Sequence, residues 1–193
     1  MLHIITPLYR FELIEKVYSS IPINDDVLWH ISYSTKRELP KLSLLDNNKQ
    51  IKIYPVDCED NDTASKRNAI LKEIRDGYFC FLDDDTIFHD NMYIKYMECT
   101  EENFKGMLVG QQLDIKNKLR LIASKPVFAR IDSGNVLCHY KCLEECSWPY
   151  KHVEGVNQKD FLFWDSVYYY YGKKCAIWNQ PISFYNKLST KLK

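Results

Sequence analysis

An apolar run that ends in three adjacent carboxylates constrains the fold of this chain more than any other feature. Residues 78–82 read Tyr-Phe-Cys-Phe-Leu, and Asp83, Asp84 and Asp85 follow directly. An apolar run of this length predicts a strand that is buried on both faces of a parallel sheet. The carboxylates then lie at the carboxyl end of that strand, which is the edge where open α/β sheets bind their ligands.

The acidic triplet is a candidate cation site. Three clustered negative charges repel one another unless a cation neutralises them. In an extended chain Asp83 and Asp85 share one face and Asp84 points the other way, so two oxygen ligands can converge on one hard divalent ion. The alternative for the same residues is a solvated acidic turn. We predict Asp83 and Asp85 as metal ligands.

The composition limits the size of the fold and the class of partner. The chain has 193 residues, and its 26 Lys and Arg equal its 26 Asp and Glu. A balanced charge provides no strong basic field for a nucleic-acid backbone or an anionic membrane, so we expect no nucleic-acid partner. A chain of this length buries one sizeable core, which predicts a single domain over residues 1–193.

No segment of the sequence predicts secretion or a membrane span. Residues 1–7 are largely apolar but have no basic flank and no small-residue cleavage site. No later stretch approaches the roughly 20 apolar residues of a transmembrane helix. We therefore expect a cytoplasmic protein.

The seven cysteines are expected to be free thiols, because a chain without a secretion signal rarely carries a disulfide framework. Cys138, Cys142 and Cys146 recur every four residues. That period favours the buried stripe of one helix, and the paired spacing of a structural zinc site is missing.

Strands and helices alternate along the first half of the chain. Apolar periodicity predicts strands over 2–6, 27–34 and 51–56, a helix over 11–20, and a second helix that ends before Gly77. This alternation is typical of an α/β fold with a doubly wound, mostly parallel sheet flanked by helices.

The second helix carries a candidate anion-binding residue. Asp62 or Thr63 can cap its start, and Arg67 lies one turn later on its inward stripe. A right-handed crossover brings this helix start to the edge where the acidic triplet emerges. We expect Arg67 to face a bound diphosphate and not a protein carboxylate, the alternative being a surface ion pair. Its neighbours Lys66 and Lys72 are expected to be solvated.

With these motifs, the sequence resembles the nucleotide-sugar-dependent glycosyltransferases of the GT-A fold. The matching segments are Ile-Ile-Thr-Pro-Leu-Tyr-Arg at 4–10, Thr-Ala-Ser-Lys-Arg-Asn-Ala at 63–69, and Phe-Leu-Asp-Asp-Asp-Thr at 81–86, which corresponds to the DxD motif. The similarity covers residues 1–115 well and is loose over 116–193. The Asp-Asp-Asp form is also similar to glucuronyltransferases and small viral glycosyltransferases. This favours a UDP donor and, for a viral chain, the host cytoplasm.

The resemblance implies a role for each matching residue. Asp85 would bind Mn²⁺ or Mg²⁺ that bridges the donor diphosphate, and Asp83 would lie on the ribose or nucleotide side. Asp57, after the third strand, would hold the base or the ribose. The implied donor-binding residues are Thr6, Pro7, Tyr9, Asp57, Arg67, Asp83 and Asp84.

The carboxyl half, residues 116–193, is expected to bind the acceptor and to supply the catalytic base. In inverting members of this fold an acidic residue at a helix start deprotonates the acceptor hydroxyl. Asp160, ahead of the apolar residues 161–164, is the closest match, although Lys159 stands where the family has a first acid. A helix cap is the alternative role for Asp160. The other candidates for the base are Asp132, Glu154 and Asp165, and Trp148 is a candidate platform for a sugar ring.

The sequence thus predicts a metal-dependent, inverting glycosyltransferase that moves a sugar from a nucleotide diphosphate donor to a glycan or other hydroxyl acceptor. A nucleotidyltransferase is one alternative, but it would ordinarily show a glycine-rich phosphate loop, and residues 6–10 contain no glycine. The other alternative is a sugar-binding or nucleotide-binding module without turnover.

Overall fold

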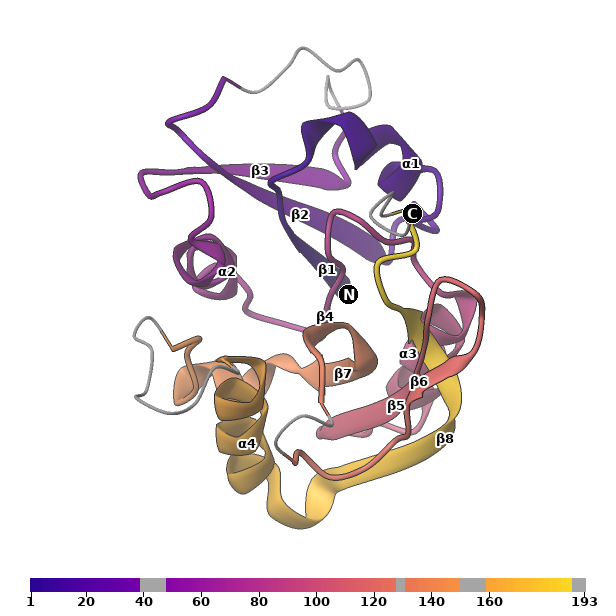
Figure 1. Ribbon diagram of the computed structural model, residues 1–193. Coiled ribbons are helices and arrows are strands. Elements are labelled where there is room, and N and C mark those ends of the chain that lie inside the picture. Colours follow the sequence, from indigo (N-terminus) through magenta and orange to yellow (C-terminus); the bar gives the residue numbers. More distant parts are fainter. Residues whose placement is uncertain (39–47, 128–130, 150–158, 189–193) are drawn as a thin grey trace.

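The computed structural model describes residues 1–38, 48–127, 131–149 and 159–188. Four parallel strands form one half of its central sheet, in the order β3-β2-β1-β4 (Figure 1). These strands are β1 Leu2–Pro7, β2 Val27–Ser34, β3 Ile51–Val56 and β4 Tyr78–Phe81. All four residues of β4 are buried, as a strand covered on both faces requires.

The second half of the sheet is mixed. β7 (Val136–His139) pairs antiparallel with β4, and β5 (Met107–Leu113) pairs antiparallel with β7. β6 (Leu119–Leu121) and β8 (Cys175–Phe184) both pair with β5, antiparallel and parallel respectively. Because β7 runs against β4, the chain that precedes β7 lies beside the carboxyl end of β4. That placement brings the 3₁₀ turn Ser133–Asn135 next to the acidic triplet.

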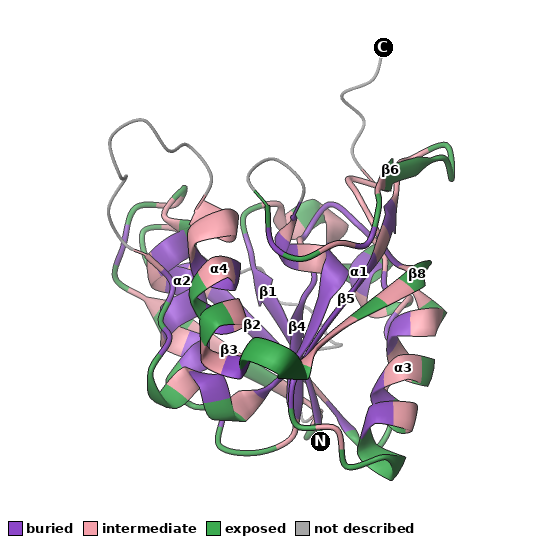
Figure 2. Ribbon diagram, turned by 90° about the horizontal axis from the view of Figure 1, so that it is seen from below, coloured by how far each residue is buried: buried purple, intermediate pink, exposed green. Residues whose placement is uncertain are grey.

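Helices cover both faces of the sheet. α2 (Thr63–Leu71) and α4 (Lys159–Tyr171) pack on one face, and α1 (Ile14–Tyr18) and α3 (Asp90–Glu101) pack on the other. Figure 2 shows β1, β2, β4 and β5 as a largely buried layer between these helices, whereas β3, β6 and most of β8 are intermediate or exposed. Two apolar clusters result, one on each side of the sheet. The predicted α/β architecture is confirmed.

Local signals placed several elements correctly. β2 and β3 have the predicted bounds, and the Asp62 side chain caps α2 by accepting the backbone N–H of Ser65 at 3.1 Å. Gly77 has a φ of +64°, and a Cβ at this position would lie 2.0 Å from the carbonyl oxygen of Met1. A glycine is therefore required where the chain turns into β4.

Three expectations about individual segments are wrong. Cys138 lies in β7 and Cys142 in the 3₁₀ turn Tyr140–Glu144, so the four-residue spacing does not mark a helix. A strand end followed by a tight turn also directs both side chains into one core, and their sulfur atoms are 3.6 Å apart. Lys66 and Trp148 are completely buried, although they were expected to be accessible.

None of the described helices has the length and apolar character that crossing a lipid bilayer requires.

Candidate active site

A cleft of about 470 Å³ opens at the carboxyl end of the parallel strands, beside the acidic triplet. Its volume lies within the range of typical small-ligand sites. The loops after β1, β3 and β4, the starts of α2 and α4 and the segment after β8 all contribute to its walls. The lining residues are Pro7, Tyr9, Arg10, Asp60, Asn61, Thr63, Arg67, Asp83, Asp84, Asp85, Asp160, Tyr185 and Asn186.

Asp84 is turned into the protein and holds the loop after β1. Its Oδ2 accepts the backbone N–H of Tyr9 at 2.5 Å and that of Arg10 at 2.6 Å. The guanidinium of Arg10 pairs with the other carboxylate oxygen, and only 3% of Asp84 is exposed. Asp84 therefore contributes to the cleft chiefly by ordering Tyr9 and Arg10.

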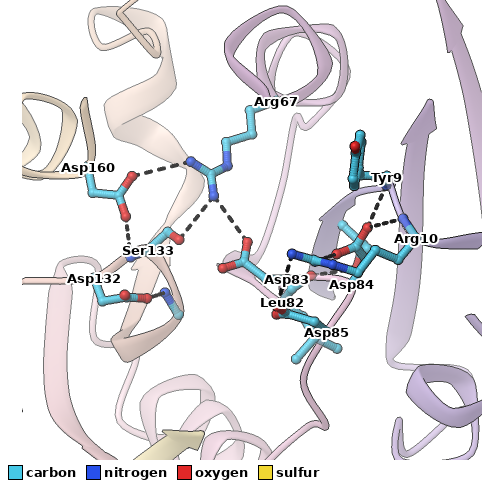
Figure 3. A network of polar contacts seen from close by, with 12 residues as sticks. Tyr9, Arg10, Arg67, Leu82, Asp83, Asp84, Asp85, Asp132, Ser133 and Asp160 are labelled. Carbon is cyan, nitrogen blue, oxygen red and sulfur yellow. Dashed lines mark hydrogen bonds and ion pairs between the residues drawn. The ribbon is translucent and has the colours of Figure 1, made fainter. Parts of the chain in front are cut away.

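Arg67 connects two carboxylates that are far apart in the sequence (Figure 3). Its Nη2 lies 3.2 Å from Asp83 Oδ1, and its Nη1 lies 3.3 Å from Asp160 Oδ1. Nη2 also donates to the Ser133 hydroxyl at 3.1 Å. The expectation that Arg67 would face no protein carboxylate is wrong, because its guanidinium compensates both acids at the sheet edge.

Trp148 lies beneath this guanidinium. Arg67 Cζ is 4.1 Å from the centroid of the Trp148 ring and 5.0 Å from that of Phe81, distances at which a cation is attracted by an aromatic face. Asn68 fixes Trp148 by bonding to its backbone N–H and carbonyl at 2.9 and 2.8 Å. Trp148 thus supports Arg67 from within the core, and its buried ring is not a sugar platform.

Asp160 is the second residue of α4, as the sequence indicated, and its side chain is 30% exposed toward the cleft. Its Oδ2 accepts the backbone N–H of Ser133 at 3.0 Å. The bonds from Ser133 and Arg67 fix both carboxylate oxygens, which gives Asp160 a defined orientation. Among the other candidates for the base, Glu154 lies outside the described residues, and Asp165 is not among the residues that line the cleft.

Asp132 lies near Asp160, and its carboxylate is hydrogen-bonded to the turn that it begins. Its Oδ1 accepts from the Gly134 backbone at 3.0 Å and from Gln112 Nε2 at 3.1 Å. Its Oδ2 lies 3.2 Å from Arg120 Nη1, which leaves 15% of the side chain exposed.

Negative charge is in excess at the sheet edge. Burial raises the pKa of Asp83 to about 7, and the nearby carboxylates of Asp132, Asp160 and Asp85 add to this rise while Arg67 opposes it. Protein atoms surround Asp83, yet 38% of its side chain stays open to the cleft. Burial also raises the pKa of Asp85 and of Asp160. A bound cation would relieve this repulsion.

The carboxylates at the cleft fit a divalent cation that takes its remaining oxygen ligands from a substrate and from water. No cluster of three or more His, Cys, Asp or Glu side chains with metal-binding geometry occurs within residues 1–38, 48–127, 131–149 and 159–188. Mg²⁺ commonly binds through one or two protein carboxylates and takes its remaining ligands from phosphates and water. Asp83 and Asp85 both line the cleft and would be that pair, with Asp85 nearly fully buried and its Oδ2 3.1 Å from Arg10 Nη2.

The remaining predicted residues have different positions. Pro7 and Tyr9 line the cleft. The hydroxyl of Thr6 is buried in the sheet, where it donates to the Leu82 carbonyl at 2.8 Å and accepts from Trp29 Nε1 at 2.9 Å. Asp57 is exposed just after β3 and lies apart from the described cleft lining, whereas Asp60, three residues later, is part of it.

Several lining residues were not predicted from the sequence: Arg10, Asp60, Asn61, Thr63, Tyr185 and Asn186. Asp60 lies two residues before the cap of α2, so the helix start was an available signal for it. Tyr185 and Asn186 follow β8 at the other end of the chain. They reach the cleft because Leu188 donates its backbone N–H to the carbonyl of Asp85 at 2.7 Å. No local pattern in the sequence indicates that return.

No protein-family model matches the chain, and no curated protein matches it in sequence. Solved structures are similar to it in fold. The S. aureus TarS fragment 1–349 superposes with a TM-score of 0.69 at 13% identity over 93% of this chain and 60% of that fragment. The same fragment in complex with UDP-GlcNAc gives 0.64 at 13% identity over 86% and 53%, and its complex with UDP gives 0.62 at 14% identity over 86% and 54%.

The chain therefore spans less than two thirds of the TarS fragment, and an identity of 13% reports on the fold alone. The chain has the GT-A type of α/β fold that its sequence predicted.

Proposed function

We propose that this protein is a metal-dependent glycosyltransferase that transfers a sugar from a UDP-sugar to a hydroxyl group of a glycan or other acceptor, with inversion at the anomeric carbon. The observation that carries the proposal is the bridge from Arg67 to Asp83 and Asp160 inside the cleft. The bridge supports the proposal because it brings a guanidinium suited to a diphosphate together with one carboxylate suited to a metal ion and one suited to accepting a proton. The UDP and UDP-GlcNAc complexes of TarS support the choice of donor class.

The donor would lie across the starts of three loops. Tyr9, Asp60 and Arg67 all line the cleft. We assign the part beside Tyr9 and Asp60 to the nucleoside and the part beside Arg67 to the diphosphate. Arg67 suits a diphosphate because its guanidinium offers several N–H donors in a fixed plane, and such charge-assisted bonds are strong. A diphosphate that takes over these donors competes with Asp83 and Asp160, which hold them in the free protein.

Asp83 and Asp85 would hold the divalent cation. When bound, Mn²⁺ or Mg²⁺ supplies a positive charge that stabilises the departing nucleoside diphosphate. Arg67 adds a second positive charge on the same side of the cleft.

Asp160 would act as the general base. Burial raises the pKa of Asp160, which makes its carboxylate a better proton acceptor than that of an ordinary aspartate. The acceptor oxygen attacks the anomeric carbon, the bond from that carbon to the diphosphate oxygen breaks, and the acceptor proton passes to Asp160. Attack from the face opposite the leaving group inverts the configuration.

A panel of UDP-, GDP- and dTDP-sugars, each with Mn²⁺ or with EDTA, tests this proposal. A ligand that binds only the native state raises the melting temperature, so UDP-sugars with Mn²⁺ should give the largest shift. Release of UDP from the donor then distinguishes a transferase from a binding module, and release of pyrophosphate from UTP would indicate a nucleotidyltransferase. Equal behaviour in Mn²⁺ and in EDTA would contradict the metal requirement.

A further inference from the structure

Lys66 is a charged residue inside the protein with no exposed surface, in the first half of α2. Consecutive helix residues point about 100° apart, so Lys66 and Arg67 leave α2 in different directions. Lys66 Nζ donates to the Leu8 carbonyl at 2.8 Å and to the Asp60 carbonyl at 2.6 Å. It also lies 3.5 Å from the Asp60 carboxylate.

The two carbonyls belong to two separate walls of the cleft. Leu8 precedes Tyr9 and Arg10 in the loop after β1, and Asp60 precedes Asn61 in the loop after β3. Arg37 ties the same two loops together nearer the surface, because its Nη1 donates to the Tyr9 carbonyl at 2.6 Å and to Asp60 at 2.9 Å. Lys66 is thus the buried member of a pair of cations that join the loops.

The loop after β1 is held from both sides. Asp84 accepts the backbone N–H groups of Tyr9 and Arg10, while Lys66 binds the carbonyl of Leu8 one residue earlier. The backbone N–H of Leu8 bonds to the Ser32 carbonyl at 2.7 Å, and the Tyr9 carbonyl accepts from Arg37, so the segment is also anchored to β2 and to Arg37. A shift of the ammonium would move both the Tyr9 side and the Asp60 side of the cleft.

Burying an ammonium group is costly unless each of its donors is bonded. An apolar residue would fill the same space at lower desolvation cost, but it would leave the carbonyls of Leu8 and Asp60 without their donor. A lysine at this position is well suited to fixing the distance between two loops that are far apart in the sequence.

We propose that Lys66 is a positioning residue for the nucleotide: its buried ammonium fixes the separation of the Tyr9 and Asp60 walls at the width that a nucleoside diphosphate requires. This inference rests on the proposed function. A pre-organised pocket binds more tightly because its loops need not be ordered by the ligand. Lys66 itself does not touch the nucleotide.

Lys66→Met is the direct test, because methionine keeps most of the length of the side chain and removes the charge and the donors. Lys72→Met is the matched control, since Lys72 follows α2 and is exposed. UDP with Mn²⁺ is titrated into each folded variant by calorimetry, well below its melting temperature. Lys66→Met should bind UDP at least about tenfold more weakly, Lys72→Met should match the wild type, and Lys66→Arg should recover part of the loss. In turnover assays Lys66→Met should raise the KM for the donor more than it lowers kcat.

A folded Lys66→Met protein with wild-type affinity for UDP would overturn the inference, because a purely structural lysine changes the melting temperature and not the affinity of the folded state. If Lys66→Met does not fold, Lys66→Gln takes its place, because glutamine keeps an N–H donor but is too short to bond both carbonyls. A folded Lys66→Gln protein should also bind UDP more weakly than the wild type, and wild-type affinity in it would overturn the inference. A wild-type protein that binds no UDP contradicts the proposed function instead.

Discussion

The guanidinium of Arg67 lies 3.3 Å from the carboxylate of Asp160, so the residue proposed to bind the donor and the residue proposed to deprotonate the acceptor hold each other in the free protein. A diphosphate that captures Arg67 would release one oxygen of Asp160, while the backbone N–H of Ser133 keeps the other in place. Donor binding would thereby free one oxygen of Asp160 to accept the proton. We therefore expect the donor to bind before the acceptor.

Arg67→Ala should weaken binding of UDP with Mn²⁺ by roughly ten- to a hundredfold, since a lost charge-assisted contact costs on the order of 1.5–3 kcal/mol. The variant should also melt at a lower temperature, because Asp83 and Asp160 lose their shared cation. Calorimetric titration and thermal melts measure the two effects. Arg75→Ala, at an exposed arginine just beyond α2, is the control. Unchanged UDP affinity in Arg67→Ala would remove Arg67 from the donor site.

Neighbouring members of the acidic triplet should respond differently to the same substitution. Asp84→Asn weakens the bonds to the backbone of Tyr9 and Arg10, so it should lower the free energy of unfolding by about 1.5–3 kcal/mol. Asp85→Asn should instead abolish Mn²⁺-dependent turnover, with a melting temperature close to that of the wild type, because Arg10 keeps its pair with Asp84. Denaturant unfolding and donor turnover on both variants check the contrast. Full activity of Asp85→Asn in excess EDTA would contradict the metal assignment.

The raised pKa of Asp83 makes stability depend on pH. In the unfolded chain this carboxyl ionises near pH 4, and in the folded protein its pKa is about 7. The folded state therefore holds a proton that the unfolded state has lost, and this group destabilises the protein progressively as the pH rises from about 4 to about 7. Asp83→Asn should raise the melting temperature of the metal-free protein at pH 8 and change it little at pH 4.

Melting temperatures in the presence of Mn²⁺ test the same carboxylate of Asp83. The ion binds the ionised carboxylate, so it should raise the melting temperature of the wild type more at pH 8 than at pH 5.5. In Asp83→Asn most of that shift should be absent. Buried histidines such as His30, whose pKa burial lowers to about 3, destabilise the protein at acid pH. The difference in melting temperature between Asp83→Asn and the wild type at each pH removes the contribution of these histidines, which both proteins share. An equal Mn²⁺ shift at both pH values would contradict metal binding by Asp83.

The sequence was informative where local rules decide the structure. The apolar run of β4, the cap of α2 by Asp62 and the helix start at Asp160 each follow from residues close together in the chain. These features were enough to place Arg67 and the acidic triplet at one edge of the sheet.

Long-range packing accounts for what the sequence did not reveal. The antiparallel entry of β7 beside β4 brings Ser133 to Asp160, and no local pattern encodes strand order. Lys66 looked solvated because charged residues are usually exposed. Its burial depends on two carbonyls supplied by other loops. Trp148 was likewise assigned to the surface because its contacts with Arg67 and Asn68 span much of the chain.

Asp160→Asn separates the base from a helix cap. Asparagine keeps the shape and can still accept the Ser133 N–H, but it cannot take the acceptor proton. Transfer should fall by about 10² or more, the usual contribution of a general base, while UDP affinity and melting temperature change little. Asp165→Asn, on the same helix and apart from the cleft lining, should retain full activity. NMR of the wild-type product should show inversion. A role limited to capping predicts the reverse, a loss of stability with little kinetic effect. A retained anomeric configuration, or an active Asp160→Asn enzyme, would show that another group accepts the proton.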